Sequence, residues 1–187
     1  MRPNNEKKLA EADLVNSILQ GNKAVFGVII RNTEGLVTQI VVRMISNPED
    51  RKDIIQEVYF RAYRSLPDFS FRSKLSTWIG HIAYNSCVNY LEKKKLVLRE
   101  DLEEGPAGDE TEEILFKKEL LMILAAQIGK LTSLYRTMIV LYHQEEMSYA
   151  DIAQIMDLPE GTVKSYLFRA RKMLKEGILA QYKKEEL

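Results

Sequence analysis

The 187 residues of this chain suffice for one or two small domains, and their 45% apolar content is that of a globular protein. The single cysteine, Cys87, excludes an internal disulfide and argues against a cysteine-based metal cluster. The net charge is zero, but residues 1–95 carry +5, residues 96–113 carry −7 and residues 114–187 carry +2. Because there is no signal peptide and no apolar run near about 20 residues, we expect a cytoplasmic protein without stable membrane insertion. We also expect no metal and no cofactor.

Apolar residues recur at helical spacing along the chain, with no strand alternation of useful length and no internal repeat. The fold class is therefore predicted to be all-α. We expect helices over residues 7–20, 24–46, 49–66, 74–95, 113–129, 133–143, 148–156 and 161–180.

The helix that follows Asn47-Pro48 has two distinct faces. Asparagine is a favourable cap, proline is a favourable first residue, and Pro67 ends the helix. The stripe that we expect in the core is formed by Ile55, Tyr59, Ala62 and Leu66. The other side carries Asp53, Gln56, Glu57, Phe60 and Arg64. A phenylalanine among acids and amides predicts a surface for docking another helix, and the alternative is a Phe60 buried against a neighbouring helix.

Residues 96–113 form the clearest boundary in the chain. They hold eight acidic side chains, two glycines and a proline, a composition that cannot form a core. We therefore predict a flexible acidic linker between two small helical domains, residues 1–95 and residues 114–187.

The segment from Ser148 to Lys175 predicts a helix-turn-helix. Ser148 with Asp151 forms a capping box, and Pro159 and Gly161 break the first helix before the second begins. The apolar stripe of the second helix is Val163, Leu167, Ala170, Leu174 and Ile178. From Gly161 to Lys175 there are five basic residues and no acidic one, which suits the phosphates of duplex DNA.

The face opposite that stripe carries Lys164, Ser165, Phe168, Arg169, Arg171, Lys172 and Lys175. Of these, Lys164, Ser165 and Arg169 lie near the helix start, where side chains reach base edges. One alternative is an amphipathic helix that is only solvated. Phe168 has two interpretations, contact with a thymine methyl or sugar, or packing back onto the preceding helix.

Several strings together resemble the bacterial extracytoplasmic-function sigma factors. They are L-Q-G-N-K-A-V-F near residue 20, N-P-E-D-x-x-D-I-I-Q-E-V-Y-F-R-A-Y from Asn47, F-R-S-K-L-S-T-W-I-x-x-I-A-Y-N from Phe71, and S-Y-A-D-I-A-Q-I-M with G-T-V-K-S-Y-L-F-R-A-R-K-M-L from Ser148. Each string is weak evidence alone. Their order and spacing across almost the whole chain carry the resemblance.

The resemblance implies a dissociable subunit of bacterial RNA polymerase that brings the core enzyme to promoter DNA and helps to open it. The helix matching Asp53 to Arg64 is implied to dock on the coiled-coil clamp of the largest polymerase subunit, through Asp53, Gln56, Glu57 and Phe60. The helix-turn-helix is implied to read the minus-thirty-five element. The contacts expected there come from Thr162, Lys164, Ser165, Phe168, Arg169, Arg171 and Lys172.

The resemblance also implies that residues 69–95 meet the minus-ten element. Aromatic rings stack bases, amides read base edges and basic groups hold phosphates, so the expected contacts come from Arg72, Lys74, Trp78, Asn85 and Asn89. For the two asparagines the alternative is a solvated face. For Trp78 a packing role is favoured, because it borders the stripe of Leu75, Ile79 and Ile82.

Some residues depart from the family pattern. Gly80-His81 stands where relatives carry a bulkier residue and a basic one, and Tyr166 stands where many carry arginine. The promoter sequence therefore does not transfer from relatives. The resemblance further implies an anti-sigma factor as a partner.

Other functions were weighed on the same residues. An enzyme is not predicted, because the two histidines lack ligand spacing and no nucleophile or phosphate-cradling motif is present. The main rival is a helix-turn-helix activator of the response-regulator or quorum-sensing type, which would need an alternating strand-helix receiver domain. A pure interaction adaptor conflicts with the basic second helix. The modest charge of each half predicts that the chain binds duplex DNA poorly without polymerase.

Overall fold

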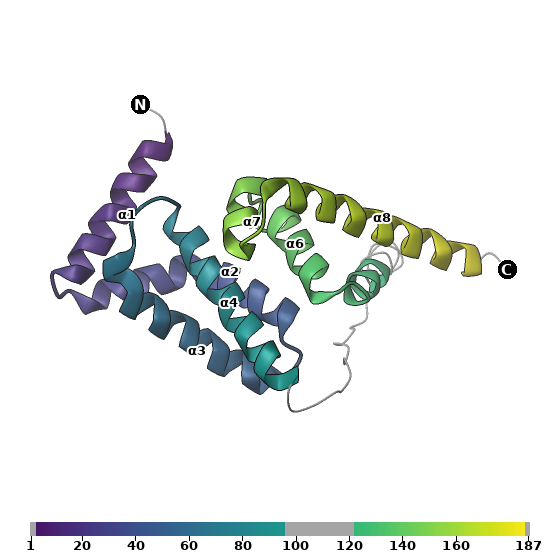
Figure 1. Cartoon of the computed structure of the whole chain (residues 1–187), viewed down its shortest axis with the longest axis horizontal. Coiled ribbons are helices and arrows are strands. Elements are labelled where there is room, and N and C mark those ends of the chain that lie inside the picture. The colour runs from purple at the N-terminus through teal and green to yellow at the C-terminus, as the bar shows by residue number, and fades with distance from the viewer. Residues whose placement is uncertain (1–2, 96–121, 186–187) are drawn as a thin grey trace, which may run out of the picture.

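The computed structural model describes residues 3–95 and 122–185, and within them every regular element is a helix, as expected (Figure 1). The α-helices are α1 (Pro3–Leu19), α2 (Phe26–Met44), α3 (Pro48–Ser65), α4 (Leu75–Lys95), α6 (Ser133–His143), α7 (Tyr149–Met156) and α8 (Glu160–Glu185). Short 3-10 helices, η1 (Lys23–Val25) and η2 (Leu66–Asp68), precede α2 and follow α3. Residues 122–129 are also helical. The predicted linker, 96–113, lies outside the described residues.

Capping side chains explain where three of the helices begin. The Asn47 carboxamide oxygen accepts a hydrogen bond from Glu49 N at 2.9 Å, ahead of Pro48 at the first position of α3. Thr132 caps α6 by accepting from Tyr135 N. Ser148 caps α7 by accepting from Asp151 N at 3.1 Å.

The turn between α7 and α8 differs from the expectation in one residue. Asp157 adopts the left-handed conformation, with φ of 52°, and the Leu158 N–H donates to Ala153 O at 3.0 Å to close the end of α7. Gly161, to which the sequence interpretation gave the unusual backbone angles, lies in the first turn of α8. Aspartate tolerates this conformation better than most side chains do, so the glycine is not needed for the turn.

Helix α2 is the centre of the N-terminal bundle. Its buried side chains are Phe26, Ile29, Thr33, Leu36, Val37, Ile40, Val41 and Met44. By length and composition alone, Lys23–Met44 is apolar enough to cross a membrane, so the expectation of no such run is wrong. These apolar side chains form the core against α3 and α4 instead.

Packing in the core determines which side chains of α3 are buried, and it also buries the single cysteine. The buried side chains of α3 are Ile54, Val58, Tyr59 and Ala62, whereas Ile55, expected there, is only half-buried. Cys87 on α4 is fully buried, and desolvation raises the pKa of its thiol to about 12.

The two halves of the described chain pack against each other. Helix α6 lies on α2 and α7 lies on α4 (Figure 1). One cluster of buried apolar side chains therefore runs through both halves. Gly80 permits the close approach of α7, because a Cβ placed there would lie 3.0 Å from Ile155 Cδ1. Ile155 and its neighbour Ile152 are fully buried.

Candidate nucleic-acid interface

Helix α8 has the two faces that its sequence predicts. Val163, Leu167 and Ala170 are fully buried and Leu174 is 9% exposed, so this stripe fixes the helix on α6 and α7. Ile178, expected to continue the stripe, is half-buried.

The polar face of α8 points to solvent. Lys164, Ser165, Arg169 and Lys172 are exposed, while Thr162 and Arg171 are half-buried. Phe168 is 68% exposed, so it does not pack back onto α7. This face therefore presents cations and one aromatic ring together, a composition suited to a nucleic-acid backbone.

Acidic residues border this face at both ends. Lys164 Nζ lies 3.0 Å from Glu160 Oε1, and Lys172 Nζ lies 3.8 Å from Glu176 Oε1. These exposed pairs contribute little to stability, so both cations remain available to a stronger anion.

A second exposed surface lies on α3 and is called here the α3 face: Asp53, Gln56, Glu57 and Phe60. All four side chains are exposed, as predicted, and Phe60 is 56% exposed, which rules out its burial against a neighbouring helix. Arg64 lies over the Phe60 ring at 5.6 Å, and Glu57 accepts from Arg61 Nε at 2.6 Å.

The residues predicted to meet the minus-ten element are divided by the structure. Lys74, directly before α4, is exposed but pairs with Asp151 of α7, and Asn85 is half-buried with its amide bonded to His81. Arg72 and Asn89 are exposed. Trp78 is half-buried, with its ring centroid 5.1 Å from that of Phe69, in agreement with the favoured packing role.

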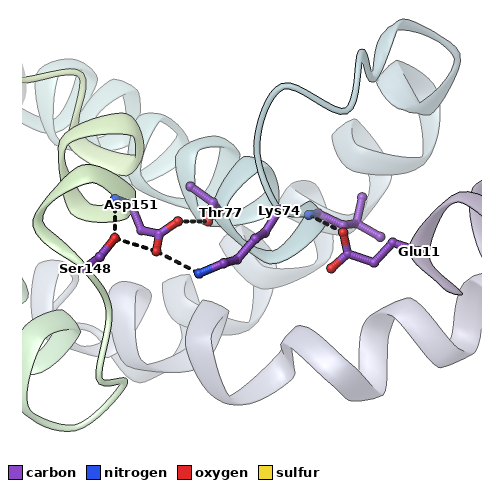
Figure 2. A network of polar contacts seen from close by, with 6 residues as sticks. Glu11, Lys74, Thr77, Ser148 and Asp151 are labelled. Carbon is purple, nitrogen blue, oxygen red and sulfur yellow. Dashed lines mark hydrogen bonds and ion pairs between the residues drawn. The ribbon is translucent and has the colours of Figure 1, made fainter. Parts of the chain in front are cut away.

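Asp151 joins the two halves of the chain (Figure 2). Its carboxylate accepts hydrogen bonds from Lys74 Nζ at 2.8 Å, Thr77 Oγ1 at 3.0 Å and Ser148 Oγ at 2.7 Å. Burial raises the pKa of Asp151, but the hydrogen bonds from Lys74, Ser148 and Thr77 outweigh it, so the net pKa is lowered. Glu11 of α1 accepts from Leu75 N at the start of α4 (Figure 2).

His81 forms a second link one turn further along α4. Its Nδ1 lies 3.2 Å from the carbonyl oxygen of Ile155, which can only accept, so Nδ1 carries the proton. In the neutral ring Nε2 then accepts from the Asn85 amide at 2.9 Å. Asn85 is therefore oriented through His81 by α7.

Sequence reasoning did not predict that Asp151, Thr77 and His81 would link the two halves of the chain. Asp151 was identified only as part of a capping box, and no local signal pairs it with a lysine 77 residues earlier. Within residues 3–95 and 122–185, no three His, Cys, Asp or Glu side chains gather into a possible metal site.

Comparison with known proteins places both halves in one family. Residues 29–97 match Sigma-70 region 2, and residues 121–174 match Sigma-70, region 4. The chain is 34% identical over 184 residues to the ECF RNA polymerase sigma-E factor of Haemophilus influenzae, covering 92% of this chain and 97% of that one. The chain belongs to the extracytoplasmic-function (ECF) sigma factors.

Solved structures agree with this sigma-factor fold. CnrH, in complex with the cytosolic domain of CnrY, matches 91% of this chain and 98% of its own with a TM-score of 0.66 and 21% identity. The sigma factor RpoE of Bartonella quintana, in complex with the anti-sigma factor NepR, covers 82% of this chain and 96% of its own, with a TM-score of 0.65 and 22% identity.

The family settles the general function. This sigma factor is a transcription initiation factor, a regulatory role, and the activator alternative is not favoured. The family does not by itself assign roles to the individual residues described above.

Proposed function

We propose that this sigma factor acts through three surfaces on three helices. The α3 face docks on core RNA polymerase, α4 meets the minus-ten element, and the basic face of α8 reads the minus-thirty-five element. Residues 1–95 and 114–187 act as the two promoter-binding domains, with 96–113 as linker. A factor that works on polymerase and promoter DNA acts in the cytoplasm and needs no cofactor or catalysis of its own.

The observation that carries this proposal is the exposed ring of Phe60. A large apolar side chain that is 56% exposed on a polar face is explained by a protein partner. Aromatic residues surrounded by polar groups are also the side chains that dominate binding energy at interfaces.

The packing of α7 on α4 adds a condition to the proposal. Thr77 and His81 are covered by α7 and bonded to it, so they are free for a DNA strand only when the halves separate. Lys74 is exposed, but its ion pair with Asp151 must also be exchanged for a phosphate. We expect polymerase to bind the separated form, and the same packing is a reason to expect poor DNA binding by the free chain.

An anti-sigma factor is the second proposed partner. It rests on the resemblance and on the Bartonella quintana relative, whose structure contains one. Such a partner would bind the free sigma factor in competition with core polymerase, and analytical gel filtration of the three proteins together measures that competition.

Transcription in vitro with bacterial core polymerase and a promoter library tests the function. We expect initiation at a defined subset of promoters that depends on both proteins. Tight sequence-specific DNA binding by the chain alone, with no initiation, would favour the activator and contradict the proposal.

The substitution Phe60→Ala tests the α3 face. We expect core-polymerase affinity to fall by roughly tenfold, about 1.4 kcal/mol, as for an interface anchor. The free energy of unfolding should change by less than about 0.5 kcal/mol, because the ring is already exposed. Fluorescence anisotropy of labelled protein measures the affinity, and chemical denaturation measures stability.

Leu179→Ala is the matched control, because Leu179 is 51% exposed on α8. It should leave polymerase affinity at the wild-type value. Equal affinity of Phe60→Ala and wild type would remove the α3 face from the polymerase contact.

A further inference from the structure

Two tyrosines from α6 and α7 stand between two cations of α8 and form what we call the tyrosine column. The rings of Tyr142 and Tyr149 are stacked, with centroids 5.1 Å apart and planes at 14°. The Arg171 guanidinium lies 4.7 Å from the Tyr142 ring centroid, and Lys164 Nζ lies 5.6 Å from that of Tyr149. Arg171 Nε also donates to His143 Nε2 at 3.3 Å. Both cations are therefore held toward α6 and α7.

The spacing along α8 makes this arrangement possible. Lys164 and Arg171 are seven residues apart, about two helical turns, and so lie on the same side of α8. Arg169 is five residues after Lys164 and points about 140° away around the helix. It lies outside the column, and its guanidinium is 5.9 Å from the ring of Tyr166 on α8 itself.

The column lies on the side of α8 where a DNA strand would pass. In a helix-turn-helix the first helix crosses the sugar-phosphate backbone, while the start of the second reaches base edges. Tyr149 is the first residue of the first helix, α7. Lys164 and Arg171 lie on the rings of the column, so this surface carries positive charge.

We infer that Lys164 and Arg171 grip the DNA backbone, that Tyr142 and Tyr149 are positioning residues for them, and that base reading falls to Arg169 and its neighbours. This inference rests on the proposed function. Under this inference Lys164 and Arg171 supply affinity, and Arg169 supplies specificity. The expectation from the sequence instead gave Lys164 a base-reading role.

The physical basis is the entropy of long side chains. Free lysine and arginine side chains lose rotamer freedom when they bind a phosphate. Because the rings already restrict Lys164 and Arg171, these side chains have less rotamer freedom left to lose when DNA binds. Glu160 also pairs with Lys164, and a phosphate must displace this carboxylate.

The test uses holoenzyme, assembled with core polymerase, on promoters that differ in the minus-thirty-five element, over a series of salt concentrations. Lys164→Ala and Arg171→Ala should weaken binding by the same factor on every promoter. Each should also reduce the slope of log affinity against log salt by about 0.9, the value for one lost phosphate contact. Arg169→Ala should instead change which promoters are preferred.

The tyrosines are tested by two replacements at each position. Tyr142→Leu and Tyr149→Leu remove the ring and should weaken binding on all promoters by roughly two- to fivefold, the equivalent of one exposed cation–π contact. Tyr142→Phe and Tyr149→Phe keep the ring and should retain most of the affinity. Thermal unfolding of each variant separates this effect from loss of folding.

The outcomes distinguish the inference from the function on which it rests. Suppose that the wild-type holoenzyme selects promoters. Wild-type affinity in both leucine variants would then overturn the proposed role of the tyrosine column, and so would altered promoter choice in Lys164→Ala with an unchanged salt slope. A wild-type holoenzyme that selects none would overturn the proposed function as well.

Discussion

His143 ends α6 beside a permanent cation. Its Nε2 accepts a hydrogen bond from Arg171 Nε, which requires an unprotonated ring nitrogen. Partial burial, and then the charge of Arg171, lower the pKa of His143 below its usual value. The folded state therefore favours the neutral ring, and stability linked to His143 is present above the unfolded pKa of about 6.5 and is lost as the pH falls through the folded value.

A proton NMR titration of the two histidines tests this residue, with signals assigned from His143→Gln. We expect His143 to titrate below the midpoint of a free histidine. Arg171→Ala should move that midpoint upward, because it removes both the cation and the donor. A midpoint at or above the free value in the wild type would contradict the arrangement.

For single residues, the exposure of a side chain could largely be predicted from the sequence, but its partners far along the chain could not. Phe60 was expected on an exposed polar face and is exposed, whereas the sequence left two interpretations open for Phe168, which is also exposed. Asp151 sits in a capping box that local spacing reveals, yet its bond to Lys74 depends on which helix faces meet. Helical periodicity shows that a face is buried or exposed without showing what lies against it.

Two glycines inside long helices show how packing modifies local propensity. Gly35 of α2 is exposed and has open space where a Cβ would lie. Gly80 of α4 is buried, and a Cβ there would lie 3.0 Å from Ile155 Cδ1. Replacement of Gly35 by alanine therefore tests helix propensity alone. Replacement of Gly80 by alanine tests helix propensity together with crowding against α7.

Gly35→Ala should raise the free energy of unfolding by about 0.5–1 kcal/mol, because alanine has the higher helix propensity and a less flexible unfolded chain. Gly80→Ala should give less, since the added methyl crowds Ile155. Urea denaturation of both variants and wild type measures the difference. An equal gain in the two would show that α7 does not press on α4 at Gly80.

The element boundaries show what local signals achieve. Asn47-Pro48 and Ser148 predicted the starts of α3 and α7 because capping depends on a few adjacent residues. The turn before α8 was assigned to Gly161, but Asp157 takes the left-handed conformation. Aspartate and glycine both tolerate the left-handed conformation, so residue type alone does not show which of the two adopts it.

The arrangement of the halves was the least predictable feature. The sequence indicated two helical units and an acidic segment, and the family was recognised from its motifs. Nothing in either unit predicted that α7 would lie on α4, pair with Lys74 and bond to His81. That contact comes from complementary shape between Ile155 and the gap at Gly80.

A disulfide between α4 and α7 tests whether the halves must separate. In Gly80→Cys with Ile155→Cys, the new Cβ at position 80 would lie 3.1 Å from Ile155 Cγ1, the atom whose place the new sulfur at position 155 takes, so the two side chains are close enough for a disulfide. We expect the oxidised double variant to give no run-off transcript with core polymerase, and reduction to restore it.

Each single cysteine variant and the wild type, measured in both redox conditions, control for the reductant. Gel mobility without reductant measures closure of the bond. Full activity of the oxidised, cross-linked protein would show that α4 works with α7 in place.

The burial of Cys87 has a consequence for signalling. Because desolvation raises the pKa of this thiol to about 12, almost none of it is ionised at neutral pH, and the thiolate is the form that reacts readily with peroxide or glutathione disulfide. This is the sole sulfhydryl of the chain. We therefore expect oxidative signals that change promoter choice through thiol chemistry to be sensed by another molecule rather than by Cys87.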